Sequence, residues 1–176
     1  ECERIVLLPL YPQSAFAPTQ SVIKSFKDAL KSMEWLPDVR IIEHYGTNPL
    51  YIKAIADSIR ATGFDPAAGD RLVLSFHAIP LKDQQAGDTY CAQVEASVEL
   101  VARELAIEPD AVTVGYQSVF GPKESEWVSP LTRNILDEWR GDFDGRVILA
   151  CPGFSIDCLE TIDDVVREFM SRVEFG

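Results

Sequence analysis

The chain has 176 residues, enough for one full domain or for one domain with part of another. Apolar residues make up 47% of it and charged residues 25%, a balance typical of folded globular proteins and not of disordered chains. The 28 acidic residues outnumber the 16 basic ones, and the net charge of −12 excludes a basic surface for nucleic acid or anionic lipid. No run of about 18 apolar residues occurs, so the sequence predicts no transmembrane helix.

The N-terminus lacks the basic start and small-residue cleavage site of a signal peptide, so we expect a cytoplasmic protein. It begins with Glu1 and not with methionine, which suggests that Glu1 is not the natural start. Cys2, Cys91, Cys151 and Cys158 include no Cys-x-x-Cys pair, and we therefore expect free thiols rather than disulfides or a structural zinc site.

Predicted strands and helices alternate from the beginning of the chain. Ile5–Leu10 is a short apolar run with prolines at its end, which predicts a strand buried on both faces. Apolar residues at helical spacing predict a helix over Pro18–Ser32, and Val39–Ile42 predicts the second strand. A further helix is expected from Pro49, with Asn48 as its N-cap.

The alternation continues to the end of the chain. The predicted elements there are a strand at Arg71–Phe76, a helix at Tyr90–Leu105, a strand at Val112–Tyr116, a helix at Pro130–Trp139, a strand at Arg146–Ala150 and a helix at Asp157–Phe169. Such alternation predicts an α/β fold: a doubly wound parallel sheet with helices on both faces, the Rossmann-type three-layer sandwich.

His77 follows directly after the predicted strand Arg71–Phe76. In an open parallel sheet, ligands bind beyond the carboxyl ends of the strands, and His77 is expected at that edge. Imidazole titrates near neutral pH and binds divalent metals, so His77 is a candidate for proton transfer or metal binding. A histidine that is only hydrogen-bonded in a loop fits the same position. No role is predicted for His44.

Three acidic residues, Glu160, Asp164 and Glu168, recur every four positions of the predicted last helix and form one line along its face. Like charges at this spacing destabilise an isolated helix by about a few tenths of a kcal/mol per pair, which favours a line that handles a cation. Oxygen ligands suit Mg²⁺ and Fe²⁺, and a histidine nitrogen shifts the preference toward transition metals. A solvated acidic face is the alternative.

A third polar group, Tyr116–Gly121 with Glu126–Pro130, combines amide, hydroxyl and aromatic side chains just after a strand. It suits the edge of a flat aromatic ligand, and equally the packing of loop aromatic residues on the core. The glycine patterns of dinucleotide sites and P-loops are absent, as is the Gly-x-Ser-x-Gly of serine hydrolases, so the sequence supports neither a nucleotide enzyme nor a serine hydrolase.

Taken in chain order, six segments resemble the ferrochelatases, especially those of the bacterial type. They are Leu8–Gln13, Ser75–Pro80, Gly87–Tyr90, Tyr116–Ser118, Glu126–Trp127 and Pro152–Thr161. The likeness extends from about Ile5 to Glu168, with the segments in the order and spacing of that family.

The resemblance implies two similar doubly wound lobes with a porphyrin held between them. Residues 1–46 would form the end of the first lobe, and residues 47–176 the second lobe with its metal-site helix. The implied reaction is insertion of Fe²⁺ into protoporphyrin IX or coproporphyrin III in heme biosynthesis. His77 and Glu160 would be the facing catalytic pair, and His77, Glu160, Asp164 and Glu168 the metal-binding residues.

The resemblance also implies that Tyr11 and Gln13 bind the substrate from the first lobe, and Gln117 and Ser118 from the second. Fe²⁺ is expected as a substrate and not as a prosthetic group, with room for a second divalent ion on the acidic helix face and with no iron–sulfur cluster. Because family members are about twice as long, we expect a fragment that lacks an N-terminal lobe. Its expected partners are porphyrin and Fe²⁺, without nucleic acid, and a peripheral association with membranes is compatible with the sequence.

Three positions depart from the family pattern, since Ala78, Thr89 and Val119 stand where Gly, Pro and Arg are usual. An arginine at position 119 would supply a partner for carboxylates. These departures keep open a second hypothesis, a non-catalytic relative that binds a tetrapyrrole or a metal. A third hypothesis is a cobalt or nickel chelatase, although such enzymes generally have more histidines than the two present here.

Overall fold

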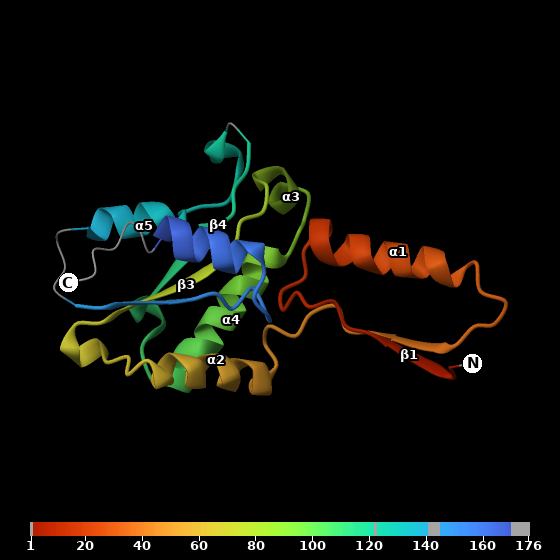
Figure 1. The fold of residues 1–176 in the computed structure, drawn as a ribbon, viewed down its shortest axis with the longest axis horizontal. Coiled ribbons are helices and arrows are strands. Elements are labelled where there is room, and N and C mark those ends of the chain that lie inside the picture. The colour runs from red at the N-terminus through yellow and green to blue at the C-terminus, as the bar shows by residue number, and fades with distance from the viewer. Residues whose placement is uncertain (1, 122, 141–144, 170–176) are drawn as a thin grey trace.

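The structure is a computed structural model, and it describes residues 2–121, 123–140 and 145–169, without the side chains of residues 164 and 166–168. Its strands form two separate parallel sheets, one of two strands and one of three. The two-stranded sheet lies with the N-terminal helix at one end of an elongated molecule, and the larger sheet with the remaining helices lies at the other (Figure 1).

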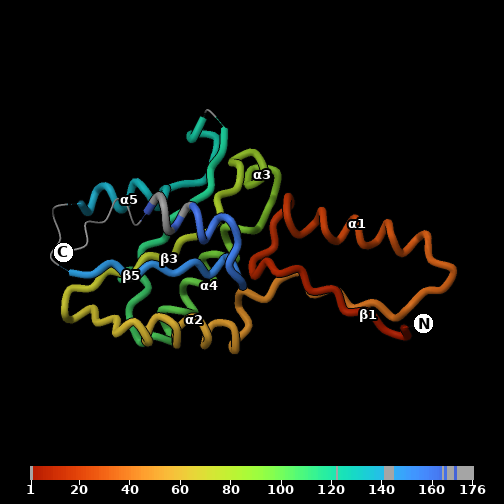
Figure 2. Tube along the Cα trace, viewed as in Figure 1, coloured from red at the N-terminus to blue at the C-terminus, as the bar shows by residue number. Residues whose placement is uncertain are grey.

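In the smaller sheet, β1 (Arg4–Leu7) pairs in parallel with β2 (Asp38–Ile41). Between them run a short π-helix, η1 (Phe16–Gln20), and α1 (Ser21–Leu30), which lies along one side of the strands in Figure 2. The sequence predicted a strand that extends to Leu10 and is buried on both faces. Both predictions are wrong, because β1 ends at Leu7 and its residues alternate between exposed and partly buried. Proline has no N–H for a further ladder bond, and a strand in a two-stranded sheet has few neighbours, so Val6 is 53% exposed.

In the larger sheet, β3 (Arg71–His77) lies between β4 (Val112–Gln117) and β5 (Val147–Ala150), and all three strands are parallel. The apolar residues of β3 form the centre of the core. Leu72, Val73, Leu74 and Phe76 are all 0% exposed. A continuous apolar run of this kind is typical of a parallel strand covered on both faces, as the sequence predicted.

Helices cover both faces of this sheet, which confirms the α/β class (Figure 1). On one face lie α2 (Pro49–Ala61) and α4 (Tyr90–Leu105), which pack against each other. On the other lie α5 (Thr132–Trp139) and a π-helix, η5 (Glu160–Phe169). The predicted cap of α2 is confirmed, because the Asn48 side chain accepts a hydrogen bond of 2.9 Å from the N–H of Leu50.

Several short elements lie outside the predictions: α3 (Leu81–Gln85) and the 3₁₀ turns η2 (Pro66–Ala68), η3 (Pro109–Ala111) and η4 (Glu124–Glu126). The last helix begins at Glu160 and not at Asp157, whose carboxylate accepts a hydrogen bond of 3.2 Å from the Thr161 hydroxyl. The predicted lobe boundary after residue 46 falls in the segment between the two sheets and stays a prediction. None of the described helices is both long and apolar enough to cross a membrane.

The first part of the chain, with the two-stranded sheet and α1, meets the second part, with the three-stranded sheet and the remaining helices. The two parts are joined through the buried side chain of Gln13, which is 2% exposed. Its Nε2 donates hydrogen bonds to Ser97 Oγ at 3.0 Å and to the carbonyl oxygen of Pro152 at 3.4 Å. The Tyr51 hydroxyl donates to the same carbonyl at 3.2 Å. Gly46 allows this approach, because a Cβ there would lie 2.6 Å from Gln13 Nε2. These contacts hold the loop after β1 and the loop after β5 against each other.

Candidate functional site

A cavity of about 760 Å³ opens where the two parts meet, beyond the carboxyl ends of β3 and β5. Its size falls in the range of small-molecule sites, and its place matches the ligand edge of an open parallel sheet. Leu10, Tyr11 and Gln13 line it from the first part of the chain. His77 and Glu160 line it from the second.

His77 is the last residue of β3, so its ring stands at the end of the central strand. Its Nδ1 lies 2.6 Å from the carbonyl oxygen of Ala78. Because a carbonyl oxygen can only accept, Nδ1 carries a hydrogen, and in the neutral ring the lone pair is therefore on Nε2. The ring of Phe154 lies beside it, with the two ring centres 6.4 Å apart.

Glu160 is the first residue of η5, and its carboxylate is held in the charged form. A hydrogen bond from the Cys158 side chain lowers the pKa of Glu160 most, and the backbone N–H of Glu160 adds to the effect. Partial burial opposes this lowering, while electrostatic attraction to His77 supports it. The site therefore presents a carboxylate and an imidazole to one cavity.

The structure thus brings together the two residues on which the sequence interpretation depends. His77 and Glu160 come from opposite halves of the second part of the chain, line one cavity and interact electrostatically. The backbone of Asp164 and Glu168 continues along η5, and their side chains lie outside the described part of the structure.

Of the four predicted substrate-binding residues, two line the cavity. Tyr11 is 40% exposed at its wall, and Gln13 is buried there, where its Oε1 has no hydrogen-bond partner among the residues that the structure describes. Gln117 and Ser118 are not among the lining residues. Gln117 is 3% exposed behind the wall, and Ser118 turns the chain away from β4 with a positive φ of 63°.

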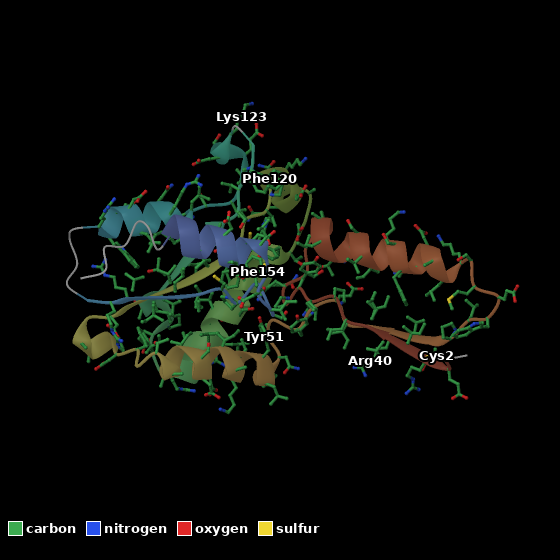
Figure 3. All side chains as sticks on the ribbon, in the orientation of Figure 1. Cys2, Arg40, Tyr51, Phe120, Lys123 and Phe154 are labelled. Atoms are coloured by element: carbon green, nitrogen blue, oxygen red, sulfur yellow. The ribbon has the colours of Figure 1, made fainter. Side chains whose placement is uncertain are left out.

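Other lining residues were predicted only as members of longer segments. Phe154 follows the Pro152-Gly153 break after β5, and Cys158 precedes Glu160 by two positions. Phe120 is 71% exposed and meets Trp127 edge to face, with ring centres 4.6 Å apart. Figure 3 shows Phe154 near the first turn of η5 and Phe120 on the loop beyond β4. These rings, together with Tyr11, suit a flat and largely apolar ligand.

Two of the three departures from the family pattern fit this local structure. Ala78 is 1% exposed and lines the cavity, and Val119 packs on the main apolar core. The four cysteines are free, as predicted. Among the side chains that the structure describes, which do not include those of Asp164 and Glu168, no three of His, Cys, Asp or Glu come together in a group that could hold a metal ion.

Comparison with known proteins identifies the family of this chain. It matches the family profile described as Ferrochelatase over residues 1–174. It is 39% identical to a ferrochelatase of Hydrogenovibrio crunogenus over 166 residues, 94% of this chain and 43% of the relative. It is 36% identical to ferrochelatases of Nitrosomonas europaea and Vibrio cholerae, which it covers to 45% and 51%. The chain therefore spans about half the length of these relatives, and with nearly all of its own sequence matched it belongs to the ferrochelatase family.

Proposed function

We propose that the full-length protein is a ferrochelatase of heme biosynthesis, which exchanges two pyrrole protons of a porphyrin for one Fe²⁺. The observation that carries the proposal is the convergence of His77 and Glu160 on one cavity. The size of the cavity and its aromatic lining are compatible with a flat macrocycle. Family membership supports the reaction type.

In this proposal His77 accepts one pyrrole proton at a time and releases the first to solvent before it takes the second. The hydrogen bond from Nδ1 to the carbonyl oxygen of Ala78 leaves the Nε2 lone pair as the basic atom. A general base must lie within hydrogen-bond reach of the proton that it removes, and a ring bound beside Phe154 would meet that condition. Bending the macrocycle to expose its nitrogen lone pairs would draw about 1–5 kcal/mol from binding energy elsewhere in the cavity.

Glu160 would admit the metal opposite His77. Its lowered pKa keeps the carboxylate charged at neutral pH, which suits attraction of a hydrated cation. We further propose that Asp164 and Glu168, on the same helix, extend this path for metal or protons and offer room for a second divalent ion. Asp164→Asn with Glu168→Gln should then raise the KM for Fe²⁺ and leave the KM for porphyrin unchanged.

Tyr11 and Gln13 are proposed to contact the porphyrin. The unpartnered Oε1 of Gln13 supports this role, because a buried acceptor without a donor costs free energy that a ligand N–H or a bound water would recover. Gln13→Met should therefore weaken porphyrin binding, measured by quenching of porphyrin fluorescence. An unchanged dissociation constant would contradict the assignment.

The decisive experiment is anaerobic metal insertion by the full-length protein, followed through the absorbance change from free porphyrin to metalloporphyrin. Parallel assays with protoporphyrin IX and coproporphyrin III identify the substrate, and assays with Co²⁺ and Ni²⁺ test the other chelatase class. His77→Ala should lower kcat by at least about 100-fold. His44→Ala is the matched control, because His44 is the other histidine of these 176 residues and is exposed.

Two results would contradict the proposal. Binding of porphyrin without insertion of any metal would favour a non-catalytic tetrapyrrole-binding protein, and turnover that His77→Ala leaves intact would remove the base assigned here. The proposal also includes action in the cytoplasm, which fractionation of cells that express the full-length protein would test.

A further inference from the structure

A chain of buried hydroxyl and amide groups lies directly behind the wall of the cavity. Ser75 on β3, Gln117 on β4 and Thr132 on α5 are 0%, 3% and 0% exposed. Ser75 Oγ donates to Gln117 Oε1 at 2.6 Å and lies 2.7 Å from Thr132 Oγ1. Since the Ser75 hydrogen is used toward Gln117, the Thr132 hydroxyl donates to Ser75.

These contacts determine which way the Gln117 amide points. Its Oε1 also accepts a weak hydrogen bond from Cys151 Sγ at 3.8 Å, so the oxygen faces two donors. Its Nε2 donates to the backbone carbonyl oxygen of Glu160 at 3.4 Å. The opposite amide orientation would set oxygen against oxygen at Glu160, and the observed one is therefore the only orientation that satisfies these partners.

The backbone of Gln117 is linked to the end of β3, which carries His77. Gln117 lies opposite His77 in the parallel register of β3 and β4, and its carbonyl oxygen accepts a hydrogen bond of 2.9 Å from the N–H of Ala78. Gln117 thus bonds to the residue that follows His77 and to the backbone of Glu160. It joins the strand end that carries the imidazole to the helix start that carries the carboxylate.

We propose that Gln117 is a positioning residue for metal insertion, which sets the separation of His77 and Glu160 without touching the porphyrin. The inference rests on the function proposed above and replaces the substrate-binding role expected for Gln117. It follows from the burial of the residue, its place behind the lining residues and its bonds to both sides of the site. Displacement of a reacting group by about 1 Å can cost about 100-fold in rate, so a residue that holds this spacing affects turnover.

The test uses Gln117→Met in the full-length protein, which keeps the length of the side chain and removes its donor and acceptor. We expect kcat for Fe²⁺ insertion to fall by about 10-fold or more, with the KM for porphyrin changed by less than about twofold. Gln84→Met, the same change at an exposed position on α3, should alter neither constant. A raised porphyrin KM with an unchanged kcat would show direct substrate contact and overturn the inference.

A double-mutant cycle with Glu160→Gln separates positioning from a general structural effect. If Gln117 acts through Glu160, then Gln117→Met should cause little further loss of kcat in the Glu160→Gln protein. Full additivity of the two losses would overturn the inference. Should Gln117→Met fail to fold, Ser75→Ala replaces it, because loss of that hydroxyl frees the Gln117 amide while its donor to Glu160 remains. We expect Ser75→Ala to lower kcat by less than the loss expected for Gln117→Met. An unchanged kcat in the Ser75→Ala protein contradicts the inference.

The two proposals fail in different ways. A wild-type protein that inserts no metal overturns the proposed function, and this inference with it. If the wild-type protein is active and the Gln117→Met protein has the same kcat, only the role of Gln117 is overturned.

Discussion

The imidazole of His77 donates its Nδ1 hydrogen to the carbonyl oxygen of Ala78 across 2.6 Å. The acceptor is a backbone atom of the next residue, so no side-chain substitution removes it. The position of the Ala78 carbonyl depends on the hydrogen bond that the N–H of Ala78 donates to the Gln117 carbonyl oxygen. The orientation of the proposed base is therefore determined by the pairing of β3 with β4.

We expect neutral His77 to occur as the Nδ1–H tautomer, because Nδ1 lies 2.6 Å from the carbonyl oxygen of Ala78, which can only accept a hydrogen bond. Nitrogen-15 NMR of the full-length protein, labelled at histidine, measures the tautomer directly. His77→Ala identifies the signal, and the exposed His44 supplies an internal comparison. A predominant Nε2–H tautomer at His77 would contradict the assignment of Nε2 as the basic atom.

Asp70 and Arg146 give a prediction for acid stability. The Asp70 side chain is 3% exposed and accepts hydrogen bonds from Arg146 Nε at 3.1 Å and from Arg146 Nη2 at 2.6 Å. The hydrogen bond from Arg146 most strongly lowers the pKa of Asp70 from its ordinary value of 3.8, and the backbone N–H of Asp65 adds to this. The charged carboxylate thus stabilises the fold above about pH 4, and that contribution is lost as the pH falls through the lowered pKa.

Asp70→Asn should lower the urea midpoint at pH 7 and make stability depend less on pH below about 4. Asp110→Asn removes the same charge at an exposed position and should leave the midpoint nearly unchanged. Equal acid sensitivity in wild type and Asp70→Asn would assign the loss to other carboxylates.

Gly115 lies against α5 with no room for a side chain. A Cβ there would be 2.5 Å from Thr132 Oγ1 and 3.0 Å from Thr132 Cα. Because a backbone atom is among the contacts, the strand and the helix would have to separate. Gly115→Ala should destabilise the protein by about 1–3 kcal/mol, measured by urea unfolding. A change below about 0.5 kcal/mol would mean that α5 shifts at little cost.

Ala106 ends α4 in the left-handed conformation, with φ of 59° and ψ of 40°. An L-residue with a Cβ is disfavoured there and glycine is not, so Ala106→Gly should stabilise the protein by about 1 kcal/mol. Ala96→Gly, in the middle of the same helix, should destabilise it by a similar amount. Thermal unfolding of the two variants checks the opposite signs, and a lower melting temperature for both would contradict the role of the left-handed cap.

Cys151 should resist alkylation in the folded protein. Burial raises the pKa of its thiol to about 12, with smaller contributions from Cys158 and Asp157, so the reactive thiolate is scarce at neutral pH. Iodoacetamide should label the exposed Cys2 first, and peptide mass spectrometry gives the order. Labelling of Cys151 at the rate of Cys2 would contradict the raised pKa of its thiol.

Regular, long elements of the second part were predictable, because each carries its own pattern. The helix Tyr90–Leu105 was predicted with its observed bounds, since its apolar spacing is sustained and a proline follows it. The apolar core of β3 placed His77 at a strand end, and the position of Glu160 on a helix after β5 followed from the Pro152-Gly153 break. The meeting of the two in one cavity needed the family likeness or the structure.

The errors have a common physical cause, which is that the deciding contacts are distant in sequence. β1 ends early and remains half exposed because its surroundings, and not its own residues, determine burial. The substrate-binding role that the family resemblance implied for Gln117 stays a prediction, although its side chain turns toward Ser75 and the start of η5. Local pattern gave no sign that η5 is a π-helix, whose hydrogen bonds span five residues.

The packing of Gly46 against Gln13 has an evolutionary consequence. Because a methyl group at position 46 would occupy the space of the Gln13 amide, these two positions share one volume although they lie on different loops. A lineage that enlarges residue 46 has to shorten residue 13 and forgo its hydrogen bonds to Ser97 and Pro152. Sequence variation at the two positions should therefore be correlated, with larger residues at 46 accompanied by smaller ones at 13.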